Sequence, residues 1–254
     1  MKIVRYRHDG RDGYGALEGD RITPLDGTIG SLVPAAGAAP IALGAVRLLA
    51  PATPSKIVAI GLNYADHAAE GKRELPKEPM LFIKPSTALI GPGAAIVYPP
   101  QSTNLHHEGE LAIVIGATAS QVAAADADRY ILGYTCANDV TARDLQRRDV
   151  QFTRGKGFDT FAPLGPWIVT GLDPADLAIE TRVNGVVRQQ SRTSMLIFNC
   201  AYLVSFISHV MTLLPGDVIS TGTPAGVGPM QVGDVVEVEI EEIGCLKNPI
   251  AAPR

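Results

Sequence analysis

A run of five apolar residues, 111–115, follows directly after two glutamates, Glu108 and Glu110, and this arrangement constrains the fold more than any other feature. Side chains alternate between the two faces of a strand, so a strand that is apolar at every position must be covered on both faces. The same alternation places Glu108 and Glu110 on one face, where their charges repel each other. The chain is therefore expected to form a layered sheet with two acids at the end of a central strand.

Further strands are expected where apolar residues cluster between turn signals. They cover residues 56–61, 80–84, 131–137, 167–170, 217–221 and 235–240. Residues 177–187 are predicted to form a hairpin, because Asn184-Gly185 suits a two-residue turn. Helices are expected to be few: short ones at 66–70, at 120–129 and after Asp139, and a long one ending near Leu214. Strands without a regular strand–helix alternation predict an α+β fold with a mixed or antiparallel sheet.

The first fifty residues differ from the rest and predict a small N-terminal β domain at 1–50, followed by a larger domain at 51–254. Short strands are expected at 2–7 and 15–24, with a turn at 18–20. Residues 27–44 carry no charge and are rich in Gly, Ala and Pro, which is the composition of a loop or linker.

Charge and cysteine content argue against several classes of protein. The chain has 22 Lys plus Arg against 26 Asp plus Glu, a net charge of −4, whereas a nucleic-acid binder usually carries a basic excess. Its three cysteines, Cys136, Cys200 and Cys245, are widely spaced, so neither a zinc cluster nor a disulfide framework is expected and a reducing compartment fits. The N-terminus has no apolar signal core, and we therefore expect a cytoplasmic protein.

Residues 195–214 contain no Asp, Glu, Lys or Arg and are long enough to cross a bilayer. However, polar residues such as Asn199 and His209 interrupt this segment, and its apolar residues recur at steps of three and four. That spacing is typical of a helix that packs one face on a core. No membrane partner is therefore expected.

The motifs of several enzyme classes are absent from the sequence. It has no Gly-x-Gly-x-x-Gly fingerprint, no Walker loop around Gly155-Lys156-Gly157, no Gly-x-Ser-x-Gly elbow and no His-Glu-x-x-His helix. Nicotinamide oxidoreductases, P-loop enzymes and serine hydrolases are disfavoured for this reason.

A third acid, Asp139, follows the second apolar strand at 131–137. Two buried strands that each end in carboxylates suit an octahedral oxygen site for Mg²⁺ or Mn²⁺, and such a cation would relieve the repulsion between Glu108 and Glu110. Two alternatives stay open: the three acids are solvated strand ends, or His106 and His107 contribute to a zinc site.

Three other segments are candidates for chemistry or binding. His67 and Glu70 are three residues apart, so on one helical turn the glutamate could orient the imidazole, or the two could form an exposed surface pair. Residues 141–156 include five basic and two acidic residues, which would attract a small carboxylate substrate unless Arg147 and Arg148 are simply solvated. The glycine-rich residues 221–228 allow the backbone to approach a ligand closely, or form a tight structural turn.

Six segments taken together resemble the fumarylacetoacetate hydrolase family. They occur in order between about residues 56 and 250, and their joint occurrence is far more specific than any one of them. The segments are Gly61-Leu62-Asn63-Tyr64-Ala65-Asp66-His67, Leu81-Phe82-Ile83-Lys84-Pro85, His107-Glu108-Gly109-Glu110-Leu111-Ala112, Asn138-Asp139-Val140-Thr141-Ala142-Arg143-Asp144, Gly155-Lys156-Gly157-Phe158-Asp159 and Thr221-Gly222-Thr223-Pro224-Ala225-Gly226-Val227-Gly228.

The resemblance implies a mixed β-sheet roll as catalytic domain, a homodimer, and a Mg²⁺ or Mn²⁺ ion. It further implies roles for single residues: Glu108, Glu110 and Asp139 as metal ligands, His67 and Glu70 as the acid–base pair, Lys156 as a catalytic and substrate-contacting group, Gln146, Arg143 and Thr223 as substrate-binding residues, and Thr160 near the metal in some members. Larger members supply a fourth metal carboxylate where this chain has Asn63. The chain therefore looks more like the short bacterial members, in which water completes the metal shell.

The activity implied by the resemblance is metal-dependent cleavage of the carbon–carbon bond of a 2,4-dioxo acid of the acylpyruvate type. His67, oriented by Glu70, would activate water, and Lys156 would stabilise negative charge. The same chemistry serves an isomerase or tautomerase of diacids, which we rank second, and an oxaloacetate decarboxylase, which we rank third. A ligand carrier without activity would not need the pair His67 and Glu70.

Overall fold

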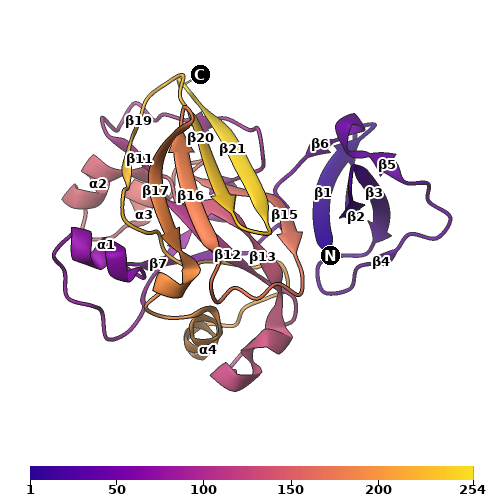
Figure 1. Ribbon diagram of the computed structural model, residues 1–254, viewed down its shortest axis with the longest axis horizontal. Helices are drawn as coiled ribbons and strands as arrows, with labels where there is room; N and C mark the ends of the chain where they lie inside the picture. Colours follow the sequence, from indigo (N-terminus) through magenta and orange to yellow (C-terminus); the bar gives the residue numbers. More distant parts are fainter. Residues whose placement is uncertain (254) are drawn as a thin grey trace.

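In the computed structural model, which describes residues 1–253, strands dominate and helices are few (Figure 1). The structure confirms the predicted α+β class with a mixed, curled β-sheet roll. Its largest sheet has thirteen strands: β1 (Lys2–His8), β2 (Arg11–Glu18), β3 (Arg21–Asp26), β4 (Val33–Pro34), β5 (Ile41–Ala42), β6 (Arg47–Leu48), β7 (Ile57–Gly61), β8 (Met80–Lys84), β9 (Leu89–Ile90), β12 (Gly109–Ile115), β13 (Ile131–Asn138), β15 (Ala162–Val169) and β18 (Val218–Ser220).

The order along this sheet is β4-β3-β2-β1-β15-β13-β12-β18-β7-β8. Most neighbouring strands are antiparallel, while β18 and β7 run parallel, so the sheet is mixed. β12 lies between β13 and β18, and each of its seven residues is buried. The prediction of a central strand from an uninterrupted apolar run is thereby confirmed.

Two smaller sheets complete the roll. The five-stranded sheet contains β10 (Ile96–Val97), β21 (Gly244–Ala251), β20 (Val235–Ile240), β16 (Ala178–Val183) and β17 (Val186–Arg192), in that order. The three-stranded sheet is β14 (Thr141–Ala142), β11 (Leu105–His107) and β19 (Gly228–Met230). The hairpin predicted at Asn184-Gly185 joins β16 to β17. β21 was not predicted, because Pro249 and Gly244 weaken its strand signal.

The helices are short. They are α1 (Ala65–Glu70), α2 (Arg143–Arg148), α3 (Thr153–Lys156) and α4 (Cys200–Val210), with 3₁₀ turns η1 (Leu43–Ala45), η2 (Ser86–Ala88), η3 (Ala124–Tyr130) and η4 (Thr193–Met195). The helix expected at 120–129 is the 3₁₀ turn η3, and α4 is much shorter than the helix expected to end near Leu214. Asn199 sets the start of α4, because its Oδ1 accepts a hydrogen bond from Tyr202 N (2.9 Å) as an N-cap.

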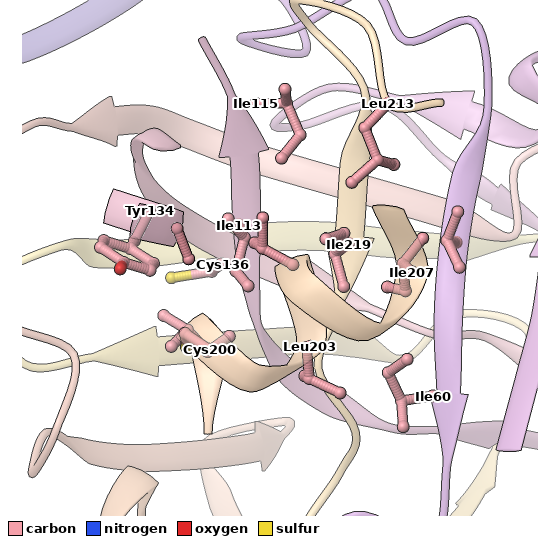
Figure 2. Close-up of a cluster of buried hydrophobic side chains, with 14 of the residues drawn as sticks. Ile60, Ile113, Ile115, Tyr134, Cys136, Cys200, Leu203, Ile207, Leu213 and Ile219 are labelled. Carbon is pink, nitrogen blue, oxygen red and sulfur yellow. The ribbon is translucent and has the colours of Figure 1, made fainter. Parts of the chain in front are cut away.

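α4 packs on the large sheet through its apolar face. Leu203 and Ile207 of α4 lie in one buried cluster with Ile60, Ile113 and Ile219 of strands β7, β12 and β18 (Figure 2). Burying each such side chain contributes about 1.5–3 kcal/mol to folding. Among residues 1–253, no helix is long and apolar enough to cross a membrane.

The N-terminal strands β1–β6 form a group at one side of the molecule (Figure 1). This group has a small core of its own, made by Val4, Tyr6, Leu17 and Ile22. β1 also pairs with β15, so the N-terminal strands extend the sheet of the larger part rather than standing apart from it. A domain boundary near residue 50 stays a prediction.

Candidate active site

Three carboxylates meet where β12 begins and β13 ends. These strands pair antiparallel with Gly109 opposite Asn138, so Glu108, just before β12, lies beside Asp139, just after β13. The backbone links them directly, since Asp139 N donates to Glu108 O (2.9 Å). Glu110 lies within β12, and one oxygen from each of the three carboxylates falls within 4.8 Å of the others. All three side chains are buried. Among the described residues, neither His106 nor His107 belongs to this group.

Three cations surround two of these carboxylates. Lys156 of α3 donates to Glu108 Oε2 (2.8 Å), Asp139 Oδ2 (2.5 Å) and Thr141 Oγ1 (2.9 Å), which uses all three protons of its ammonium group. Lys84, at the end of β8, pairs with Asp139 on its other side, and Arg143 pairs with Glu108. Each cation thus lies against an acid in a buried cluster.

These neighbours shift the pKa values in different directions. Burial alone would raise the pKa of Glu108, but the charges of Lys156 and Arg143 outweigh burial and hold that pKa well below its usual range. Burial likewise opposes the charge of both lysines. For Lys84 burial prevails and the pKa is lowered, whereas for Lys156 the two acids Asp139 and Glu108 prevail and the pKa is raised.

Glu110 differs from the other two acids, because it has only neutral donors. Ser220 Oγ (2.5 Å) and Gly222 N (3.0 Å) donate to its Oε2, and in residues 1–253 no cationic side chain lies within 4.0 Å of it. Burial, Asp139 and Glu108 raise the pKa of Glu110 to about 8. A bound cation would supply the missing charge, and three buried carboxylates are the oxygen donors that Mg²⁺ and Mn²⁺ prefer. The residues present therefore fit a divalent ion.

His67 and Glu70 meet on α1, as their spacing predicted. His67 Nδ1 lies 3.3 Å from Glu70 Oε2, and Gly226 N donates to the same carboxylate (3.2 Å to Oε1). Asp66 anchors the helix, since it accepts hydrogen bonds from His67 N (2.7 Å) and from Ser191 Oγ of β17 (2.6 Å). A carboxylate can only accept hydrogen bonds, so in the neutral form of the imidazole this contact places the ring proton on Nδ1 and leaves the lone pair on Nε2.

One pocket of about 350 Å³ brings the predicted residues together. α1, α2 and α3 lie on the same side of the roll (Figure 1), and each contributes to this pocket. The predicted residues that line it are His67, Glu70, Glu108, Glu110, Arg143, Gln146, Lys156 and Thr223. Asp139 lies behind them, because Lys84 and Lys156 cover its carboxylate.

Two predicted substrate-binding residues are held by neighbours in the pocket wall. Arg143 donates to the side-chain oxygen of Gln146 as well as to Glu108, which joins α2 to the carboxylate cluster. Thr223 Oγ1 donates to Gly109 O (2.9 Å) and accepts from Gln189 Nε2 (2.7 Å). The glycine-rich segment is thereby fastened to the start of β12.

The side chains of Asn63 and Thr160 make their hydrogen bonds outside the pocket. The Asn63 amide donates to Phe198 O (3.0 Å) and Thr221 O (2.7 Å), and its Oδ1 accepts from Phe198 N (2.8 Å). Asn63 therefore joins three segments of backbone, and neither it nor Thr160 lines the pocket. Thr160 Oγ1 instead accepts a hydrogen bond from Val97 N (2.9 Å).

Sequence reasoning missed several residues of the site. Lys84 ends an apolar strand and Ser220 ends another, so a polar residue that closes an apolar strand was the available signal. Gln189 carried no such signal. It lies in a mostly exposed strand, yet its side chain is fully buried and its Oε1 accepts from Gly109 N (2.9 Å).

Comparison with known proteins defines the class. Residues 56–251 match the fumarylacetoacetate (FAA) hydrolase C-terminal family, and residues 1–51 match the Rv2993c-like N-terminal family. The first match covers more than half of the chain, and the protein belongs to the fumarylacetoacetate hydrolase family.

Two curated relatives cover most of the chain. An uncharacterized protein of Archaeoglobus fulgidus is 60% identical over 82% of this chain and 83% of its own length. The mitochondrial oxaloacetate tautomerase Fahd2a of Rattus norvegicus is 43% identical over 81% of this chain and 69% of its own length.

Two solved structures share the fold. The 2-hydroxyhepta-2,4-diene-1,7-dioate isomerase of Mycobacterium marinum is 45% identical, with a TM-score of 0.92 over 99% of this chain and 98% of that one. The fumarylpyruvate hydrolase of Pseudomonas aeruginosa, in complex with Mn²⁺ and pyruvate, is 33% identical, with a TM-score of 0.75 over 78% of this chain and 90% of that one. The family neighbours are thus enzymes that include both isomerases and hydrolases.

Proposed function

We propose that this protein is a divalent-metal-dependent enzyme that interconverts the keto and enol forms of a 2-oxo acid. The observation that carries the proposal is that His67, paired with Glu70, lines the same pocket as Glu108 and Glu110. A proton-transfer group and a cluster of cation-binding acids on one small pocket are what enolisation requires. The relatives named for tautomerase and isomerase activity are 43% and 45% identical, whereas the solved structures named as hydrolases are 31–39% identical, and this smaller likeness favours proton transfer as the reaction.

Glu108, Glu110 and Asp139 would hold the metal ion. When bound, Mg²⁺ or Mn²⁺ would supply positive charge beside the substrate oxygens on which negative charge develops. The Mn²⁺ in the related fumarylpyruvate hydrolase supports this choice of ion. The part of the protein itself is to present three buried carboxylates and to place Lys84, Lys156 and Arg143 against two of them, Glu108 and Asp139.

His67 would move the proton. Its Nδ1–H is directed to Glu70, so Nε2 is left to take a proton from the carbon next to the 2-oxo group and to return one. Glu70 in turn is held by Gly226 N, which fixes the imidazole toward the pocket. Arg143 and Gln146, both on α2, would orient the substrate carboxylate and its oxo group.

Hydrolysis of a 2,4-dioxo acid is the second candidate. It is supported by the likeness to the fumarylpyruvate hydrolase and by the same pair, since Nε2 of His67 could equally take a proton from water. The two candidates share the metal site and differ in whether a water molecule attacks the substrate carbon.

One experiment separates these candidates. Chelator-treated protein, alone and with Mg²⁺, is mixed with the enol form of oxaloacetate and, in parallel, with acetopyruvate. Enol absorbance is followed in both, and pyruvate is assayed in the acetopyruvate sample. We expect metal-dependent loss of the oxaloacetate enol, which falls about 100-fold or more in His67→Gln and is retained in the distant control Glu18→Gln, and we expect no release of pyruvate from acetopyruvate. Pyruvate matching the enol lost would establish hydrolysis instead, and turnover that persists without metal would overturn both.

A further inference from the structure

The helix that carries His67 and Glu70 is too short to be stable by itself. α1 has six residues, and isolated helices shorter than about 12–15 residues are marginal in water. Its N-cap residue is Tyr64 rather than one of the small polar residues that usually cap a helix, and of residues 65–70 only Ala68 is buried. The position of the pair therefore depends on side-chain contacts between α1 and the rest of the protein.

One carboxylate joins α1 to strand β17. Asp66 Oδ2 accepts a hydrogen bond from Ser191 Oγ (2.6 Å), and Asp66 Oδ1 accepts one from His67 N (2.7 Å). A hydroxyl group that donates to a carboxylate over such a short distance forms one of the stronger hydrogen bonds in proteins. Ser191 is thus linked, through a single side chain, to the backbone of His67.

The same strand supports the other half of the pair. Glu70 accepts a hydrogen bond from Gly226 N (3.2 Å to Oε1). Gly226 in turn lies directly on β17, because a Cβ atom at this residue would be 2.1 Å from Arg188 O. β17 therefore holds His67 through Ser191 and holds Glu70 through Gly226.

Among the described residues that line the pocket, neither Ser191 nor Asp66 is present. Their side chains are therefore not placed to contact a substrate, and any effect they have on the reaction has to pass through His67. Such an effect can be large, since a displacement of about 1 Å in a reacting group can cost about 100-fold in rate.

We propose that Ser191 and Asp66 are positioning residues, whose hydrogen bond holds the imidazole of His67 against Glu70 and toward the substrate. The inference rests on the proposed function, which gives His67 the proton-transfer step. It adds to that function two residues outside the pocket on which the rate of the step depends.

The first test removes this hydrogen bond and then restores it. Ser191→Ala removes the donor and Asp66→Ala the acceptor, whereas Asp66→Asn keeps an oxygen for His67 N and gains an amide group that can donate to Ser191 Oγ. We expect kcat for the enol of oxaloacetate to fall about tenfold in Ser191→Ala and about 30-fold in Asp66→Ala, with KM changed less than about twofold. Asp66→Asn should restore kcat to within about threefold of the unchanged protein.

Ser194→Ala is the matched control. Ser194 also donates to an aspartate, Asp176 Oδ1 (2.7 Å), but both residues are exposed and lie outside the pocket lining. This variant loses a hydrogen bond of the same kind, and its kcat and KM should equal those of the unchanged protein.

A double-mutant cycle asks whether Ser191 acts through His67. Once His67→Gln has removed the imidazole, adding Ser191→Ala should lower the remaining turnover by less than about twofold. A loss of about tenfold in both backgrounds would overturn the inference, because Ser191 would then act on the reaction by another route.

The tautomer of His67 gives a readout that does not depend on turnover. In protein with ¹⁵N-labelled histidine at alkaline pH, the imidazole nitrogen shifts distinguish the Nδ1–H form from the Nε2–H form, and the signal of His67 is assigned by its loss in His67→Gln. We expect the Nδ1–H form, which the contact with Glu70 sets, in the unchanged protein and in Asp66→Asn. Ser194→Ala should match them, whereas Ser191→Ala and Asp66→Ala should show a mixture of both forms.

This measurement separates a failure of the inference from a failure of the proposed function. A mixture of tautomers in both alanine variants, together with a loss of kcat that depends on His67, is the expected result. An Nδ1–H form that persists in both variants would overturn the inference, whatever the activity. A mixture in these variants of a protein that does not enolise oxaloacetate would support the positioning role and reject the proposed function.

Discussion

Two buried carboxylates lie at opposite ends of the short strand β18, and they have opposite electrostatic environments. Asp217, just before β18, accepts hydrogen bonds from Ser55 N and Oγ (2.9 and 2.7 Å), Lys56 N and Nζ (3.2 and 2.5 Å) and Leu214 N (2.8 Å). Glu110, which Ser220 contacts at the other end, accepts only from neutral groups. Both side chains are 1% exposed.

The pKa values of the two acids diverge accordingly. Burial alone would raise the pKa of Asp217, but Lys56, Leu214 N and Ser55 outweigh burial and lower it. Burial and two acidic neighbours raise the pKa of Glu110 to about 8. A buried acid such as Asp217, which is paired with a cation of the protein itself, stabilises the fold. A buried acid such as Glu110, which has no such cation, is typical of a site that binds a cation from solution.

The largest effect is expected from Glu110→Gln, because it removes a metal ligand at almost constant volume. We predict that turnover falls at least about 1000-fold, on the order of 4 kcal/mol in the activation barrier. Calorimetric titration with Mn²⁺ should show weakened binding, and the melting temperature without metal should not fall. Glu18→Gln, far from the pocket, serves as control. Full turnover in Glu110→Gln would contradict the assignment of this carboxylate to the metal.

Asp217→Asn should have its effect on stability instead. The substitution removes the charge that Lys56 contacts in a buried setting, and we predict a loss of about 2 kcal/mol in the free energy of unfolding at pH 7. Urea unfolding measures this loss, and metal affinity should stay unchanged. Asp176→Asn is a matched control, since that exposed acid also pairs with a cation and a serine, Arg192 and Ser194, and its change should barely move the urea midpoint.

The pH dependence of stability should differ in sign between the two acids. A lowered pKa for Asp217 gives stability that is present above its ordinary pKa of about 3.9 and is lost as the pH falls through the folded value. The raised pKa of Glu110 gives stability that is present below about pH 4.5 and is lost as the pH rises toward 8 in metal-free protein. Urea midpoints from pH 3 to 8.5 in chelator should therefore converge at low pH for Asp217→Asn and the unchanged protein. The urea midpoints of Glu110→Gln and of the unchanged protein should diverge as the pH rises. If the difference in midpoint between variant and unchanged protein varied with pH in the same way for both variants, the predicted contrast between the two acids would be wrong.

The sequence predicts the acids of the site better than their partners. Glu108, Glu110 and Asp139 are recognisable because each ends or enters an apolar strand, and strand alternation and pairing then bring them together. Lys84 was not assigned, although it ends β8, because no local pattern shows that β8 and α3 approach the same acid from opposite sides. Such contacts depend on the order of strands in the sheet, which spacing along the chain does not determine.

The helices and strands likewise divide into those that local sequence signals predict and those that they do not. The central strand β12 and the hairpin β16–β17 follow from apolar runs and Asn184-Gly185, which are local signals. The extent of α4 was overestimated, because the capping hydrogen bond of Asn199 starts the helix five residues later than its apolar spacing suggests. The resemblance to the family implies hydrolysis before isomerisation, and that order stays a prediction, since the relatives include both kinds of enzyme.

The smallest predicted effect concerns Gln189, a buried neutral residue that contacts both the start of β12 and the pocket wall at Thr223. Its Oε1 accepts from Gly109 N and lies 3.1 Å from His107 Nδ1, while its Nε2 donates to Thr223 Oγ1 (2.7 Å) and Pro224 O (2.9 Å). Gln189→Glu keeps both acceptor contacts but loses both donors, so Thr223 should loosen in the pocket wall. We predict that KM rises about fivefold with kcat much less affected.

Gln190→Glu is the matched control, because Gln190 is the next residue on β17 and its side chain is exposed. A double-mutant cycle with Thr223→Val then tests whether Gln189 acts through Thr223. If Gln189 acts through Thr223, adding Gln189→Glu to Thr223→Val should raise KM little further, because the hydrogen bond from Gln189 Nε2 to Thr223 Oγ1 is already absent in Thr223→Val. Additive effects on KM would instead mean that Gln189 acts through Gly109 and the start of β12, that is, on the carboxylates rather than on the substrate-facing wall.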